Sequence, residues 1–179
     1  MKTTTLLHAD EISRIIDRLA CQIIERHDAC EKTVILGIQR RGVDIAIRLC
    51  AVLEEKLGHK LPFGTLDINL YRDDWTTLHT RPTIGESHIP TPLDNKNVIL
   101  VDDVLFSGRT IRAALEAILD YGRPSQVELL VLVDRGHREL PIHGDYVGRK
   151  VNTARSEKVN VLMEERDGRD EVELQSADD

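Results

Sequence analysis

The chain has 179 residues, of which 41% are hydrophobic and 31% are charged, and its net charge is −7 at pH 7. The length suits one domain with a buried core, and the acidic balance argues against a protein that coats nucleic acid by bulk charge, although a local basic patch stays possible. No apolar run is long enough to cross a bilayer, and residues 1–8 are too polar for a signal peptide, so we expect a cytoplasmic protein without membrane contact.

The first half of the chain predicts helices that alternate with buried strands. Apolar residues recur at i, i+3, i+4 and i+7 over residues 12–24, which indicates an amphipathic helix. Residues 33–38 form a β-branched apolar run typical of a buried strand, and a second helix is expected over 42–57. Residues 64–71 alternate well enough for another strand.

Two segments show no such periodicity. Residues 72–95 contain three prolines and a glycine, and an irregular stretch of this length within one domain is usually functional or mobile, so we expect a mobile loop there. Residues 164–179 are strongly acidic, and we interpret them as a solvated, partly frayed tail.

The second half repeats the alternation of strand and helix. A buried strand is expected over residues 98–101, a helix over 108–121 and a further strand over 127–133, followed by short strands at 145–147 and 159–163. This order predicts an α/β fold with a mostly parallel sheet covered by helices on both faces. A ligand of such a sheet binds beyond the carboxyl ends of its strands.

The most informative pattern lies in residues 98–110, where a strand delivers two adjacent carboxylates, Asp102 and Asp103, to a short loop that opens a helix at Gly108. A helix N-terminus offers unpaired N–H groups and a positive dipole end, which suit a phosphate. Adjacent carboxylates would repel that phosphate, so they are expected to face hydroxyl groups or a hydrated Mg²⁺. A ribose 5-phosphate meets both requirements.

Other readings of this pattern fit less well. A generic strand, loop and helix with solvated aspartates remains an alternative. No P-loop is present, because residues 37–42 have its glycine spacing but continue into Val43 and Asp44 without the lysine and hydroxyl. No G-x-G-x-x-G sequence occurs either.

Residues 98–110 resemble the motif with which type I phosphoribosyltransferases bind 5-phosphoribosyl-1-pyrophosphate (PRPP). Residues 71–74, 131–142 and 145–148 further resemble the pyrimidine operon attenuation regulator family, and the resemblance extends over about 6–163. It implies a type I phosphoribosyltransferase fold with a small hood. It also implies a bifunctional protein, which transfers ribose 5-phosphate from PRPP to uracil to give UMP and pyrophosphate, and binds pyr leader mRNA under the control of UMP to regulate transcription attenuation.

The resemblance assigns roles to individual residues. Mg²⁺ would accompany PRPP and reach Asp102 and Asp103 mainly through PRPP and water, and the base would lie against Arg135 and Val159. The residues implied to bind PRPP are Asp102, Asp103, Val104, Leu105, Phe106, Ser107, Gly108, Arg109 and Thr110.

A second loop is implied to bind the pyrophosphate group of PRPP through Arg40, Arg41 and Gly42. Two guanidinium groups would suit pyrophosphate, although Arg40 could instead point into solvent. Arg72 is implied to begin the loop that closes over the active site and excludes water; alternatively, it pairs with a neighbouring aspartate on the surface.

For RNA binding, the resemblance implies a basic face. Its candidate residues are Arg14, Arg18, Arg26, Arg138, Arg149 and Lys150. This chain departs from the family pattern, because Asp17 and Cys21 stand where relatives have Thr and His, and His143 stands where many have Arg. An added carboxylate is unfavourable beside phosphates, and only 3% of residues are aromatic.

Several hypotheses therefore stay open. The first is the bifunctional regulator, and the second is a uracil phosphoribosyltransferase that has lost RNA binding. A nucleotide-binding regulator without catalysis is the third. A purine phosphoribosyltransferase is the fourth, and residues 134–142 count against it. A homo-oligomer is expected only by analogy with the fold.

Overall fold

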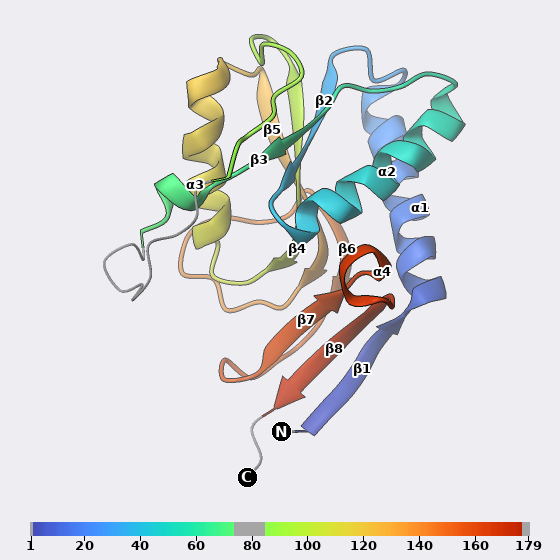
Figure 1. The fold of residues 1–179 in the computed structure, drawn as a ribbon, viewed down its shortest axis with the longest axis vertical. Coiled ribbons are helices and arrows are strands. Elements are labelled where there is room, and N and C mark those ends of the chain that lie inside the picture. The colour runs from blue at the N-terminus through green and yellow to red at the C-terminus, as the bar shows by residue number, and fades with distance from the viewer. Residues whose placement is uncertain (1, 74–84, 177–179) are drawn as a thin grey trace.

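The computed structural model describes residues 2–73 and 85–176, and its centre is a five-stranded parallel sheet with the strand order β3-β2-β4-β5-β6 (Figure 1). Its central strands are β-branched, apolar and almost fully buried, as expected where both faces of a parallel sheet are covered. The strands are β2 (Thr33–Ile38), β3 (Phe63–Leu66), β4 (Asn97–Leu105), β5 (Gln126–Asp134) and β6 (Tyr146–Lys150).

Helices cover both faces of this sheet, which confirms the predicted architecture. Helices α1 (Ala9–His27) and α2 (Arg41–Leu57) pack on one face, and α3 (Arg109–Ile118) packs on the other (Figure 1). Two short 3₁₀ turns, η1 (Asn69–Tyr71) and η2 (Leu119–Tyr121), accompany α3. Each face therefore has its own apolar core.

A second, three-stranded antiparallel sheet lies beside the carboxyl ends of the large sheet, as the expected hood (Figure 1). Its order is β1-β8-β7, so the two ends of the chain pair with each other. It consists of β1 (Lys2–His8), β7 (Lys158–Leu162) and β8 (Glu171–Ser176), with the one-turn helix α4 (Glu164–Asp167) between β7 and β8.

The hood corrects the interpretation of residues 164–179 as a frayed tail. Through residue 176 this segment is ordered, and β8 is the central strand of the hood, with Val172 fully buried. Three of its acidic side chains, Glu165, Asp167 and Asp170, are paired with arginines of α2. Strand β1 was not predicted from the sequence, because its polar TTT run lacks an apolar repeat.

The segment 64–71 and the expected mobile loop over 72–95 also differ in detail from the predictions. The strand ends at Leu66, and the chain turns into η1, which leaves Leu70 more than half exposed. Residues 74–84 lie outside the described part of the chain. Residues 85–95 pack on the domain, because His88 pairs with Thr65 and Leu93 is fully buried.

Two further findings concern the described residues only. None of their helices has the length and apolar character needed to cross a membrane. All three cysteines, Cys21, Cys30 and Cys50, are free thiols.

Candidate active site

The two adjacent carboxylates lie inside β4, close to its carboxyl end, as the sequence predicts. Asp102 is 7% exposed, and its Oδ1 accepts a hydrogen bond of 3.0 Å from the amide of Asp103. The Oδ1 of Asp103 accepts another of 2.7 Å from the amide of Val104. Burial, together with the neighbouring carboxylate, raises the pKa of Asp102 well above its usual range, and burial raises the pKa of Asp103. A pair of this kind favours a ligand that supplies hydroxyl donors or a cation.

After β4 the chain turns sharply and begins α3 at Arg109. Gly108 occupies the turn with φ of 91°, a left-handed conformation that suits glycine. The carbonyl of Ser107 accepts hydrogen bonds from the amides of Glu139 and Leu140, at 2.9 and 3.2 Å. These bonds hold the loop in place. The amide of Arg109 donates to Ser107 Oγ at 3.4 Å, and the amides that follow it in the first turn of α3 are oriented to bind an anion.

The segment predicted to bind pyrophosphate follows β2, which neighbours β4 in the sheet. The bond between Gln39 and Arg40 is a cis peptide, and α2 begins at Arg41. Gly42 packs so closely on β4 that an added Cβ would lie 2.4 Å from the carbonyl oxygen of Val101. Two loops therefore flank the acidic pair.

The two arginines of this segment differ in their surroundings. The side chain of Arg40 is exposed, whereas Arg41 donates from Nη2 to Asp167 at 3.1 Å. The positive charge of Arg41 opposes the rise in the pKa of Asp103, so the guanidinium acts on the acidic pair. The Nε of Arg41 is buried and has no hydrogen-bond partner within residues 2–73 and 85–176.

Arg72, the residue implied to begin the closing loop, lies close to the loop before α3. Together with Asp73, Ser107, Arg109 and Thr110 it lines a pocket of about 230 Å³ at the start of α3. Arg109 donates to Asp73 at 2.7 Å, so the beginning of the 72–95 segment is connected to the anion-binding loop. The structure thus brings this residue to the predicted phosphate loop.

Arg135, predicted to contact the base, is buried beneath the loop. Its guanidinium lies 4.2 Å from the ring centroid of Phe106 and donates to the carbonyl of Ala154 at 3.0 Å. Burial lowers the pKa of Arg135. Leu105 also turns its side chain into the core, and Val159 lies on β7 in the hood. Through its contacts with Phe106 and Ala154, Arg135 supports the loop before α3 and the backbone near residue 154.

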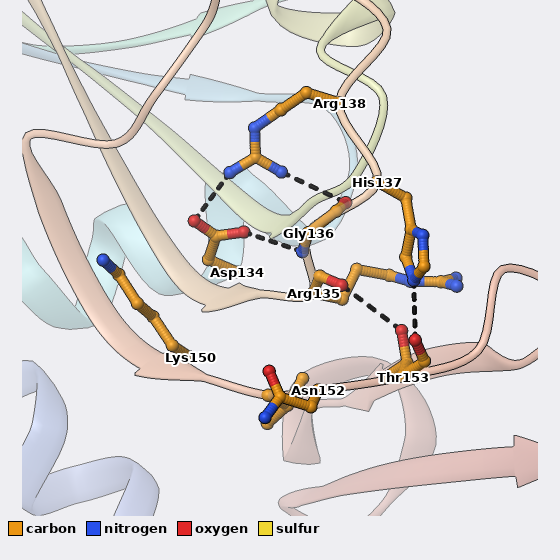
Figure 2. A pocket seen from close by; sticks show the side chains of 9 residues that line it. Asp134, Arg135, Gly136, His137, Arg138, Lys150, Asn152 and Thr153 are labelled. Atoms are coloured by element: carbon orange, nitrogen blue, oxygen red, sulfur yellow. Dashed lines mark hydrogen bonds and ion pairs between the residues drawn. The ribbon is translucent and has the colours of Figure 1, made fainter.

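Beside Arg135, a pocket of about 370 Å³ opens between the ends of β5 and β6 (Figure 2). Figure 2 shows Arg138 paired with Asp134; Arg138 Nη2 and Asp134 Oδ2 lie 2.6 Å apart, and Lys150 lines the same pocket. His137 is held to the carbonyl of Thr153 at 2.7 Å. The pocket offers carbonyl, amide and cationic groups to a small polar ligand.

The six candidate RNA-binding residues fall into three groups. Arg14, Arg18 and Arg149 line one pocket of about 280 Å³ between α1 and β6. Arg138 and Lys150 belong to the pocket of Figure 2, and Arg138 also donates to the carbonyl of Phe106 at 2.8 Å. The remaining one, near the end of α1, is Arg26.

One of the α1 residues that differ from the family pattern, Asp17, has surroundings that affect the candidate RNA-binding face. Lys56 of α2 lies 2.8 Å from Asp17, so the added carboxylate has a cationic partner. Arg26 is paired with the buried Glu128 at 2.8 Å and stacks near the ring of Tyr146. Arg26 thus contributes to the attachment of α1 to the sheet.

Sequence reasoning missed the contacts that the hood makes with the pyrophosphate segment. Asp167 contacts Arg41, and Arg166 pairs with Asp44, although about 120 residues separate the partners. No periodicity or motif connects them, and the acidic composition of 164–179 hid them. Glu139, which binds Arg109 at 2.6 Å, lies inside a recognised motif and could have been found there.

The described residues contain no group of three or more His, Cys, Asp or Glu side chains that could hold a metal. Asp102 and Asp103 nevertheless fit a Mg²⁺ ion, because they are adjacent hard oxygen ligands near the carboxyl end of β4, and burial, which raises the pKa of both, disfavours their charge unless a cation offsets it. Such an ion would take its other ligands from the substrate and water.

Comparison with known proteins agrees with this geometry. Residues 2–166 match the family model described as phosphoribosyl transferase domain. A bifunctional protein PyrR of Deinococcus radiodurans is 50% identical over 175 residues, which are 98% of this chain and 96% of that protein. Another, from Syntrophobacter fumaroxidans, is 49% identical over 172 residues, which are 96% of this chain and 92% of that protein.

Solved structures show the same fold at low sequence identity. A hypoxanthine phosphoribosyltransferase of Trypanosoma cruzi has a TM-score of 0.72 with 15% identity, and covers 96% of this chain and 95% of its own. A hypoxanthine-guanine phosphoribosyltransferase of Bacillus anthracis has a TM-score of 0.66 with 19% identity, and covers 83% and 84%. The chain belongs to the phosphoribosyltransferase family and, within it, to the group of bifunctional PyrR proteins.

Proposed function

We propose that this protein transfers ribose 5-phosphate from PRPP to uracil and also binds pyr leader mRNA in a UMP-dependent way. The observation that carries the enzymatic part is the pair of the buried Asp102 and the half-buried Asp103 on β4, flanked by the loop before α3 on one side and the Arg41 segment on the other. PRPP carries a phosphate group at one end and a pyrophosphate group at the other, with ribose hydroxyl groups between them. It therefore needs two anion sites on either side of hydroxyl acceptors.

In the reaction, the bond between ribose C1 and pyrophosphate breaks, and its electron pair leaves on pyrophosphate. N1 of uracil bonds to C1 from the opposite face and loses its proton to pyrophosphate or water. Charge develops on the leaving pyrophosphate, so catalysis depends on positioning and on cations at that group. Arg41 and the amides at the start of α2 supply them. The 5-phosphate binds at the start of α3, near Ser107 and Thr110, and the carboxylates accept the ribose hydroxyls. Asp102 and Asp103 would hold Mg²⁺ mainly through PRPP and water, and the ion would supply positive charge that offsets the charge of the pyrophosphate group.

The base lies against the segment that follows β5. Uracil offers two carbonyl acceptors and one N–H donor in its plane, which main-chain groups near Arg135 and Val159 match. Arg135 fixes the adjoining backbone through Phe106 and Ala154.

The RNA part rests on the arginines between α1 and β6. Arg14, Arg18 and Arg149 lie in one pocket, and together they form a cationic face for phosphates. The partnership of Asp17 with Lys56 offsets the added carboxylate. A protein that is acidic overall can thus carry a basic face. We also propose that the protein acts as a homo-oligomer, as is common for the fold.

The enzymatic part is tested by turnover of PRPP with uracil, hypoxanthine and adenine in the presence of Mg²⁺. We expect UMP from uracil and at least about 100-fold lower kcat/KM for either purine. Preference for a purine would contradict the base assignment. Binding of UMP without turnover of any base would leave a regulator that no longer catalyses.

The RNA part is tested by a filter-binding titration with a pyr leader hairpin at stated salt, with and without UMP. Nanomolar binding that UMP strengthens is expected, and Arg18→Ala should weaken it across all ionic strengths while leaving uracil turnover unchanged. Weak binding that is indifferent to UMP would mean that the enzyme has lost its RNA face.

A further inference from the structure

The turn that follows β7 contacts the pyrophosphate segment at two consecutive residues. Asp167 accepts from the guanidinium of Arg41, at 3.1 Å to Oδ1 and 3.4 Å to Oδ2. Its neighbour Arg166 pairs with the buried Asp44 on the first turn of α2, and its Nη2 lies 3.5 Å from the carbonyl of Arg40. The hood therefore touches the main chain of the segment as well as its key side chain.

The turn itself is held firmly against α2. Arg48 binds Glu165 and Asp170 in two forked pairs, with four N–O distances of 2.7–2.8 Å. Paired contacts between a guanidinium and a carboxylate fix the geometry as well as the distance. The turn between these two acidic residues is thus a rigid part of the α2 surface.

The carboxylate of Asp167 is fixed from its other side by the main chain. Its Oδ2 accepts a hydrogen bond of 2.9 Å from the amide of Met163. That bond, together with Arg41, lowers the pKa of Asp167, so the group is ionised at neutral pH. Asp167 is consequently an immobile acceptor, and its side chain is only 22% exposed.

Arg41 uses one nitrogen, Nη2, for this contact. Its Nε is buried and has no hydrogen-bond partner in the described part of the chain. A buried donor without an acceptor is costly, so this N–H is expected to meet an acceptor in the complete complex. The remaining edge of the guanidinium can then face an anion while Asp167 holds Nη2.

We propose that Asp167 is a positioning residue for the pyrophosphate site: it holds Arg41 by one nitrogen so that the rest of the guanidinium is aimed at the pyrophosphate group of PRPP. This inference rests on the proposed function. Asp167 does not touch the reacting atoms and acts through Arg41 alone.

The direction in which removal of the Asp167 carboxylate changes anion affinity distinguishes a positioning role from a purely electrostatic one. Removal of a carboxylate near an anion site should strengthen anion binding by charge alone. Loss of a positioning contact should weaken it, because Arg41 must then be ordered at the moment of binding. Asp167→Asn is therefore expected to raise KM for PRPP about 5- to 20-fold, with kcat changed by less than about two-fold.

The experiment uses the full chain and measures binding of pyrophosphate alone and of PRPP by calorimetry with Mg²⁺, together with kcat, KM and the melting temperature. The matched control is Glu165→Gln, which removes a carboxylate from the same turn while Arg48 keeps Asp170. Wild-type affinity is expected for this control and weaker pyrophosphate binding for Asp167→Asn. If Asp167→Asn folds poorly, Asp167→Glu keeps the acceptor and should fall between it and the wild type.

A double-mutant cycle completes the test. In an Arg41→Gln background, Asp167→Asn should weaken pyrophosphate binding no further, because its partner is absent. Equal or tighter binding by Asp167→Asn, or the same loss in both backgrounds, overturns the positioning role. Absence of PRPP binding and uracil turnover in the wild type would instead overturn the proposed function.

Discussion

Replacement of Gly42 by alanine should separate the pyrophosphate segment from the acidic pair. The added Cβ would lie 2.4 Å from the carbonyl oxygen of Val101 and 3.1 Å from the Cα of Asp102, whereas ordinary contacts begin at 3.4 Å. Both obstacles are backbone, so α2 and β4 must move apart by about 1 Å. Overpacking of this kind costs about 1–3 kcal/mol, which for a chain of this size lowers Tm by roughly 2–12 °C.

The functional loss should be larger than the loss of stability suggests. A displacement of about 1 Å in a positioning group can cost about 100-fold in rate, so kcat/KM for PRPP should fall by about two orders of magnitude. Gly58→Ala is the matched control: its φ of 77° strains any alanine by about 1–2 kcal/mol, but no atom lies within 4 Å of the new Cβ. Calorimetry and initial rates compare the two. Wild-type kcat/KM in Gly42→Ala would refute the reasoning.

Two more predictions concern charged groups. Burial raises the pKa of Asp102, so ionisation of this carboxyl opposes folding. The protein therefore loses stability as the pH rises from the pKa of Asp102 in the unfolded chain, about 4, through its pKa in the folded chain. Asp102→Asn should therefore raise Tm at pH 7 and change it little at pH 4, while uracil turnover falls; an unchanged or lower Tm at pH 7 would contradict this. Arg48→Gln leaves Glu165 and Asp170 without their guanidinium. Because these pairs are partly exposed, urea unfolding should show a loss of about 1–2 kcal/mol, and no measurable loss would count against the role of this contact.

The central sheet and its helices could be predicted from the sequence, because hydrophobic patterns and helix-end residues within each segment determine them. Residues 98–101 are a β-branched run that can be stable only as a buried strand, and the acidic pair and Gly108 then follow in a fixed order. The expected helix over 42–57 likewise agrees with α2, which ends before a left-handed Gly58. In these segments neighbours in sequence supply most of the information.

The hood could not be predicted in this way, because its stability comes from contacts distant in sequence. Strand β1 is polar and acquires its structure by pairing with β8, about 170 residues away. The acidic residues around α4 are predicted as a solvated tail from composition, whereas in the fold they pair with Arg41 and Arg48 of α2. Composition reports charge but not the pairing of charge.

The same distinction applies to the face proposed to bind RNA. From the sequence, Asp17 counts against phosphate binding, and the net charge of −7 adds to that objection. In the fold, Lys56 lies 2.8 Å from Asp17, so their charges sum to zero beside Arg14 and Arg18. An exposed pair of this kind contributes little to stability, yet it removes a local negative field from the face. Lys56→Gln should therefore weaken RNA binding, most strongly at low salt, whereas Asp17→Asn should strengthen it; identical affinities in a filter-binding series from 50 to 300 mM salt would show that the pair lies outside the RNA contact.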